Sequence, residues 1–93
     1  MIMLYAKIFR DDGQTICYYI VRMYEDRDGG DNIIIRVESE QAQEHFAEFR
    51  LPDNYCYTAF GFSEDEIDDM RKYLLHNAPL IWDMAREGRE NIA

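Results

Sequence analysis

The sequence predicts an α+β fold: an antiparallel three- to four-stranded β-meander with two or three helices packed on one face. Two observations indicate this class. The first half holds runs rich in Ile, Val and Tyr, separated by Asp-Gly turns, which is typical of antiparallel strands. The second half holds a helix-capping pattern that precedes an apolar stripe. At 93 residues and 47% hydrophobic content, one core is expected. We therefore predict a single domain over residues 1–88 and a short C-terminal tail over 89–93.

Residues 1–10 and 15–25 are predicted to form a hairpin around Asp12-Gly13. An Asp-Gly pair supplies the positive φ angles that a two-residue type I′ turn requires. This turn places Phe9 opposite Ile16, and it assigns every residue to one face because side chains alternate along a strand. The uncharged set is expected to face the core: Ile2, Leu4, Ala6, Ile8, Cys17, Tyr19, Val21 and Met23. The other set is aromatic, with two cations that can lie over tyrosine rings: Met3, Tyr5, Lys7, Phe9, Ile16, Tyr18, Ile20, Arg22 and Tyr24.

A third strand is predicted over residues 33–37, after a glycine-containing turn. A three-residue loop of Asp28, Gly29 and Gly30, with one glycine in the left-handed conformation, would pair Ile35 with Met23. The side chains expected in the core are then Ile33, Ile35 and Val37, and those expected to face outward are Arg36 and Glu38.

Residues 39–50 fit a helix better than a strand. Many of them are good helix formers, and Ala42, Phe46 and Phe49 fall on one helical stripe. The strand alternative remains open, and it would place Ala47 and Phe49 on one face and Phe46 on the other.

A fourth strand is expected over residues 55–62, after Pro52-Asp53-Asn54 breaks the chain. Ser63 and Glu66 then have the spacing of a capping box, in which each side chain satisfies the backbone N–H of the other residue. The apolar stripe that follows predicts a helix over residues 64–76.

A separate last helix is predicted over residues 79–87. Proline interrupts a continuing helix but is tolerated in a first turn, so Pro79 indicates a new start with Asn77 as its cap. Gly88 is expected to end this helix.

The charge balance limits the classes of partner. The chain has 19 acidic residues against 10 Lys and Arg, a net charge of −9. Nucleic acid and anionic membranes require clustered cations, so we expect neither as a partner. An acidic surface suits a basic protein, or simply solubility. Cys17 and Cys56 form no disulfide framework, which favours a reducing cytoplasm.

The densest group of charges is the candidate partner-binding site. It comprises Glu64, Asp65, Asp68 and Asp69, at the start of the predicted helix. Carboxylates in a first helical turn are favoured by the helix dipole, which explains part of the run without any partner. Asp68 and Asp69 lie at the edge of that turn, where the dipole effect fades, and they could steer a basic surface toward this helix.

Three tyrosines are the candidate anchors beside those charges. Tyr5, Tyr18 and Tyr24 are predicted on the second sheet face, and aromatic residues are enriched at protein interfaces. An aromatic sheet face can also stack the bases of single-stranded RNA, which is the first alternative.

Metal binding, a cofactor and catalysis are not expected. His45, His76, Cys17 and Cys56 lack the two-to-five-residue spacing of zinc ligands. The Asp-rich turn at 26–31 departs from the EF-hand pattern at its fifth, sixth and twelfth positions. A small hydrolase, using a serine with a histidine, is the last alternative, but no nucleophile motif is present.

These observations predict a small acidic, non-enzymatic binding module that recognises a basic protein surface, such as an inhibitor, an immunity protein or an antitoxin-like regulator. The strand over residues 1–9 is a candidate sheet edge with only Lys7 to discourage pairing. It should meet a further strand, a helix or another copy of itself, and we expect a homodimer.

Overall fold

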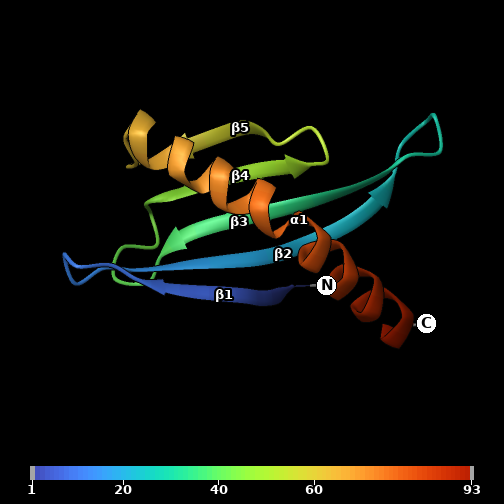
Figure 1. The fold of residues 1–93 in the computed structure, drawn as a ribbon, viewed down its shortest axis with the longest axis horizontal. Coiled ribbons are helices and arrows are strands. Elements are labelled where there is room, and N and C mark those ends of the chain that lie inside the picture. The colour runs from blue at the N-terminus through green and yellow to red at the C-terminus, as the bar shows by residue number, and fades with distance from the viewer. Residues whose placement is uncertain (1, 93) are drawn as a thin grey trace.

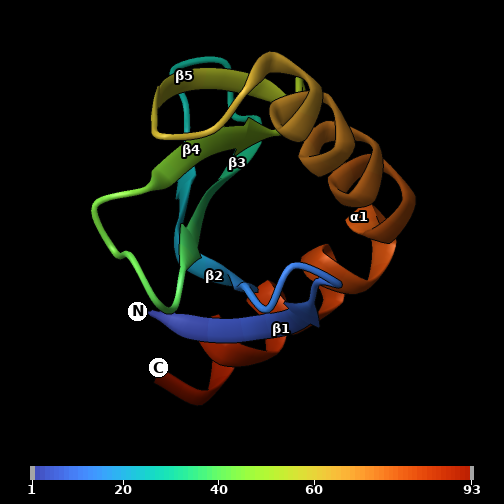
Figure 2. The same cartoon turned by 90° about the vertical axis from the view of Figure 1, so that its left-hand side faces the viewer.

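The computed structural model describes the backbone of residues 2–92 and the side chains of residues 2–88. The elements are β1 (Met3–Phe9), β2 (Thr15–Glu25), β3 (Asp31–Ser39), β4 (Phe46–Leu51), β5 (Tyr55–Phe60) and α1 (Glu64–Ile92). The strands pair in sequence order, each antiparallel to the next. Helix α1 crosses one face of the sheet diagonally (Figure 1). The sheet curves, and α1 lies on its inner side (Figure 2). We call the other side the open face.

The predicted meander of three or four strands under two or three helices is wrong. The described residues form a five-stranded sheet and one helix. Two local differences account for this. A segment predicted to be helical supplies the additional strand, β4, and the two helices predicted on either side of residue 77 are one continuous helix.

The first hairpin has a loop one residue longer than predicted. The Arg10 N–H donates to the Gln14 carbonyl at 2.8 Å, so Asp11, Asp12 and Gly13 form a three-residue loop, with Gly13 at φ 88°. Phe9 therefore pairs with Thr15 and not with Ile16. A shift of one residue in the pairing register moves every side chain of β2 to the opposite face relative to the side chains of β1. The buried residues of β2 that join the core are Ile16, Tyr18 and Ile20, which were predicted on the second face.

The second hairpin has the predicted loop length in a different position. Its three loop residues are Arg27, Asp28 and Gly29, with Gly29 in the left-handed conformation at φ 82°. Met23 consequently pairs with Ile33 and not with Ile35. The predicted core residues of β3 are confirmed: Ile33, Ile35 and Val37 are all at most 1% exposed.

Residues 39–50 do not form the predicted helix. Residues 40–45 make a connection whose backbone returns to the sheet: the Glu40 N–H donates to the Thr15 carbonyl at 2.9 Å. Strand β4 follows, and Ala47 and Phe49 are fully buried while Phe46 lies on the open face. This is the strand alternative. Pairing with both β3 and β5 outweighs the helix propensity of so short a segment.

The start of α1 is as predicted. The Ser63 N–H donates to Glu66 Oε1 at 2.9 Å, and the Glu66 N–H donates to Ser63 Oγ at 3.2 Å, which completes the capping box. The predicted break at Pro79 and the predicted end at Gly88 are wrong, because α1 continues through both to Ile92. A proline inside a helix removes one hydrogen bond. Burial on both sides of it, at Leu74 and Ile81, offsets that loss.

The core lies between the inner face of the sheet and α1. From the helix it receives Met70, Leu74, Ile81 and Ala85. These four recur at helical spacing, so a single stripe of α1 covers the curved sheet. Leu75, the next residue after Leu74, lies outside this stripe and is 70% exposed. Within residues 2–92, the helix is too polar to cross a membrane.

Candidate functional site

A hollow of about 280 Å³ lies between the sheet at β1 and β2 and the N-terminal half of α1. We call it the β1–α1 groove. Its walls are mainly apolar and aromatic, and three charged side chains join them. The lining residues are Ile8, Ile16, Tyr18, Met70 and Tyr73, with Arg10, Glu66 and Asp69.

Two contacts, one from β1 and one from the residue that follows it, reach α1 on either side of this groove. The Tyr5 hydroxyl donates to Asn77 Oδ1 at 3.0 Å. Arg10 donates to Glu66 Oε2 at 2.6 Å. Ile8 lies between Tyr5 and Arg10 in the chain, so the groove occupies the interval between the two contacts. At one end of the groove the Arg10 and Glu66 side chains remain 34% and 30% exposed, so this end is open to solvent.

The charges around the groove leave a surplus of negative charge. Arg10 is paired with Glu66 and with Asp12, the latter at 3.5 Å. The Glu66 hydrogen bond raises the pKa of Arg10. The Ser63 backbone N–H, followed by Arg10, lowers the pKa of Glu66. With one cation and three carboxylates, counting Asp69, the groove suits a cationic group.

Tyr18 forms part of the groove wall. Its side chain is 5% exposed, and its ring centroid lies 4.5 Å from that of Tyr73. Burial is the main cause that raises the pKa of Tyr18, and the charges of Tyr73 and Asp69 add to it. Tyr18 is therefore a neutral aromatic surface, which a long aliphatic side chain can contact.

The predicted acidic residues are all on the surface of α1, but the fold does not gather them into one patch. Glu64, Asp65, Asp68 and Asp69 are all exposed on the first two turns of α1. They diverge to two sides of the helix: Asp69 lines the β1–α1 groove, whereas Glu64 and Asp68 line a shallower hollow beside β5. Asp68 is also paired with Arg71 at 3.0 Å.

The predicted tyrosines are separated. Tyr5 and Tyr18 lie on the inner face, where Tyr5 contacts α1 and Tyr18 is in the core. Tyr24 lies on the open face, with the Arg22 guanidinium 4.8 Å from its ring centroid. The prediction of one shared face is wrong because β-bulges interrupt the alternation of side chains. Tyr5 is the extra residue of the bulge in β1, and the bulge between Ile20 and Arg22 puts Tyr24 on the face opposite Tyr18. Of the predicted residues, Tyr18 and Asp69 are the pair that the fold brings to one groove.

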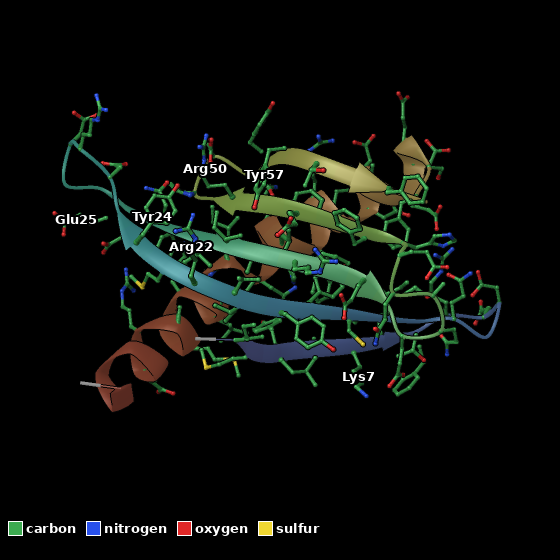
Figure 3. All side chains as sticks on the ribbon, turned by 180° about the vertical axis from the view of Figure 1, so that it is seen from behind. Lys7, Arg22, Tyr24, Glu25, Arg50 and Tyr57 are labelled. Atoms are coloured by element: carbon green, nitrogen blue, oxygen red, sulfur yellow. The ribbon has the colours of Figure 1, made fainter. Side chains whose placement is uncertain are left out.

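The open face carries more contacts between cations and aromatic rings than the predicted one, in which Arg22 lies over Tyr24. Arginine guanidinium groups lie over aromatic rings, with Arg36 4.3 Å from the centroid of Phe46 and Arg50 5.9 Å from that of Tyr55. Figure 3 shows Arg22, Tyr24, Arg50 and Tyr57 gathered at one end of this face. The cluster combines side chains of β2, β4 and β5, and shifts in the pairing of β2 and of β5 interrupt the alternation from which a shared face could have been predicted.

The potential metal ligands and nucleophiles among the described residues form no further site. No group of three or more His, Cys, Asp or Glu side chains within them could hold a metal ion. Cys17 is buried, and burial raises the pKa of the Cys56 thiol. Ser63 Oγ accepts the Glu66 N–H in the helix cap. These groups have structural roles, and the β1–α1 groove is the part of the described surface with the clearest binding chemistry.

The fold and the groove define a small α+β protein in which one long helix covers a curved antiparallel sheet. No protein-family model, no curated protein and no solved structure matches the chain.

Proposed function

We propose that this chain is a non-enzymatic binding module that recognises a basic surface of another protein, acting in the cytoplasm as an inhibitor, an immunity protein or an antitoxin-like regulator does. The observation that carries the proposal is the position of Asp69. Its exposed carboxylate lies at an apolar groove, and the exposed Asp65 lies one helical turn before it. Charge of one sign beside an apolar wall provides both steering and an anchor.

The experiment compares two variants with the same net charge. In the first, Glu64→Gln, Asp65→Asn, Asp68→Asn and Asp69→Asn remove the acidic group of α1. In the second, Asp11→Asn, Asp28→Asn, Glu44→Gln and Glu87→Gln remove four exposed carboxylates elsewhere. Each set changes the net charge from −9 to −5, since four negative charges are lost.

Each variant is used to capture partners from host lysate at low salt, and circular dichroism checks its helix content. We expect the unchanged chain and the second variant to retain the same basic protein and the first variant to lose it. Raising the salt should release this protein, because electrostatic steering is screened. Equal retention by both variants would show that the acidic group is not the recognition element.

We further propose that the chain forms a homodimer through the open face. Tyr55, Tyr57 and Phe60 are 56%, 45% and 62% exposed there, and both Arg and aromatic side chains are enriched at interfaces. Lys7, Arg36 and Arg50 are each paired with a carboxylate. The cations of this face offset its carboxylates, so two copies can meet there with less repulsion than a charge of −9 implies.

Sedimentation velocity at tens of micromolar and physiological salt tests the dimer. We expect a species near twice the chain mass of 11.1 kDa. Tyr57→Ser combined with Phe60→Ser should return it to the monomer, whereas Leu75→Ser, on the exposed side of α1, should not. A single species at the monomer mass would contradict this proposal. It would leave recognition of a basic partner unaffected.

A further inference from the structure

Strand β1 has a free edge directly beside the groove. It is the first strand in the order β1-β2-β3-β4-β5, so within the described residues only β2 pairs with it. The edge of a sheet presents backbone N–H and C=O groups that an extended peptide can pair with. This strand is also short of protecting charges, since Lys7 is the one charged residue within it.

A β-bulge limits how much of this edge is usable. The pairing of β1 with β2 shifts between Leu4 and Ala6, which leaves Tyr5 as the extra residue. A bulge twists a strand and interrupts regular pairing. The regular part of the edge is therefore residues 6–9, which pair with β2 without a shift. A strand added here would pair with about four residues of β1. So short a pairing favours recognition of a brief sequence motif.

Ile8 connects this edge to the groove. It belongs to the regular part of β1, and its side chain lines the β1–α1 groove. Neighbouring strands in a sheet lie about 4.8 Å apart, and directly opposed side chains share a face. A residue of an added strand opposite Ile8 would therefore project its side chain over the groove, toward α1.

The groove determines which side chain fits at that position. Its apolar wall of Ile8, Met70 and Tyr73 suits an aliphatic stem, and Asp69 suits a positive charge at the end of it. Lysine and arginine combine these two properties, because they bury their methylene groups while the charged head stays near water. Arg10 would not repel that head strongly, since Glu66 and Asp12 are already paired with it.

We infer that the partner contributes an extended basic segment, which adds as a strand to residues 6–9 of β1 and places one lysine or arginine in the β1–α1 groove beside Asp69. This inference rests on the proposed function, and it specifies how that function is carried out. Side chains on either side of the basic residue would face the open side, near Lys7 and Phe9. The recognised motif is then a basic residue flanked by β-forming residues.

Fluorescence anisotropy with labelled six-residue peptides tests this inference on the full chain. The first peptide carries one central lysine among threonine and valine. The second has the same sequence with N-methyl groups on alternate backbone amides, and the third replaces the lysine by norleucine. We expect binding of the first peptide and at least about tenfold weaker binding of the other two, since each change removes hydrogen bonds or the charge.

Two further measurements identify the site. Asp69→Asn should lower the affinity for the lysine peptide by about fivefold or more, a loss expected of one charge-assisted contact. The matched variant Asp28→Asn should leave this affinity unchanged. Saturating peptide should also slow hydrogen exchange of amides within residues 6–9. Equal binding of the N-methylated peptide, or unchanged exchange, would overturn strand addition.

Other outcomes separate this inference from the proposed function. If no lysine peptide binds, strand addition is wrong, whereas the lysate experiment with the two charge variants still decides whether a basic partner is recognised. If amides 6–9 become protected with rising protein concentration and no peptide, a second copy occupies the edge and the inference is overturned.

Discussion

The two faces of the sheet are covered in different ways. On the inner face, α1 buries a continuous apolar set, and Ile20, Ile33 and Val37 have no exposed surface. On the open face no helix of the described residues lies over the strands (Figure 3), yet Ile34 is only 6% exposed. The side chains beside Ile34 in the pairing are Arg22 on β2 and Arg50 on β4.

The difference shows that a single-layer sheet can cover its second face with long amphipathic side chains. Arg22 lies over the ring of Tyr24, and Arg50 lies over the ring of Tyr55. The methylene groups and rings exclude water while the charged heads remain solvated. The acidic side of α1 has no comparable cover at Asp65 and Asp69, which are exposed. This asymmetry places the available negative charge on the helix side.

The largest expected effect tests how firmly each face is packed. Ile20→Ala should lower the free energy of unfolding by about 2–5 kcal/mol, because α1 and the sheet cannot collapse around the cavity. Ile34→Ala should cost about 1–2 kcal/mol, since the flexible side chains above it can settle into the space. Urea denaturation measures both.

Leu4→Ala is the control for this comparison. Leu4 is 42% exposed, and its truncation should cost less than about 1 kcal/mol. If Ile34→Ala costs as much as Ile20→Ala, the open face is packed as rigidly as the inner one, and the contrast between them is lost.

The sequence predicted where most elements lie better than it predicted which side chains share a face. Alternation and turn residues located the first three strands and β5, and the Ser63–Glu66 spacing located the start of α1. The faces of the first hairpin were not predictable in the same way. An Asp-Gly pair is compatible with a two-residue or a three-residue loop, and this one-residue choice decides whether Tyr18 or Tyr19 is in the core.

Long-range pairing limited the remaining predictions. The propensity of residues 39–50 favours a helix, whereas hydrogen bonding with β3 and β5 makes β4 a strand. Pro79 indicates a helix break locally, whereas burial of Leu74 and Ile81 on one stripe keeps α1 continuous. Tertiary contacts override local preference in both cases.

The candidate site was predictable only in part. The acidic residues are adjacent in the chain, so their shared exposure on α1 follows from their spacing alone. The groove does not, because Ile8 and Tyr18 meet Asp69 and Met70 through a contact between the two ends of the chain. Composition and periodicity contain no signal for such a meeting.

The smallest predicted effect compares one ion pair from each face. Glu66 pairs with Arg10 at the groove, where their side chains are 30% and 34% exposed, and Glu40 pairs with Lys7 on the open face, where both are more exposed. Glu66→Gln should cost about 1 kcal/mol or less at pH 7, since the amide can still cap Ser63 but carries no charge. Glu40→Gln should produce no change that urea denaturation resolves, because exposed ion pairs contribute little.

The pH dependence of the Glu66 effect gives the decisive measurement. The folded pKa of Glu66 lies below its ordinary value of 4.5, so its charge stabilises the fold fully above that pH. The stabilisation is lost as the pH falls through the folded pKa, where the carboxylate takes up a proton. The difference between the unchanged chain and Glu66→Gln should therefore shrink when urea denaturation is repeated near pH 3. A difference that stays constant between pH 7 and pH 3 would mean that packing, and not charge, holds this end of the groove.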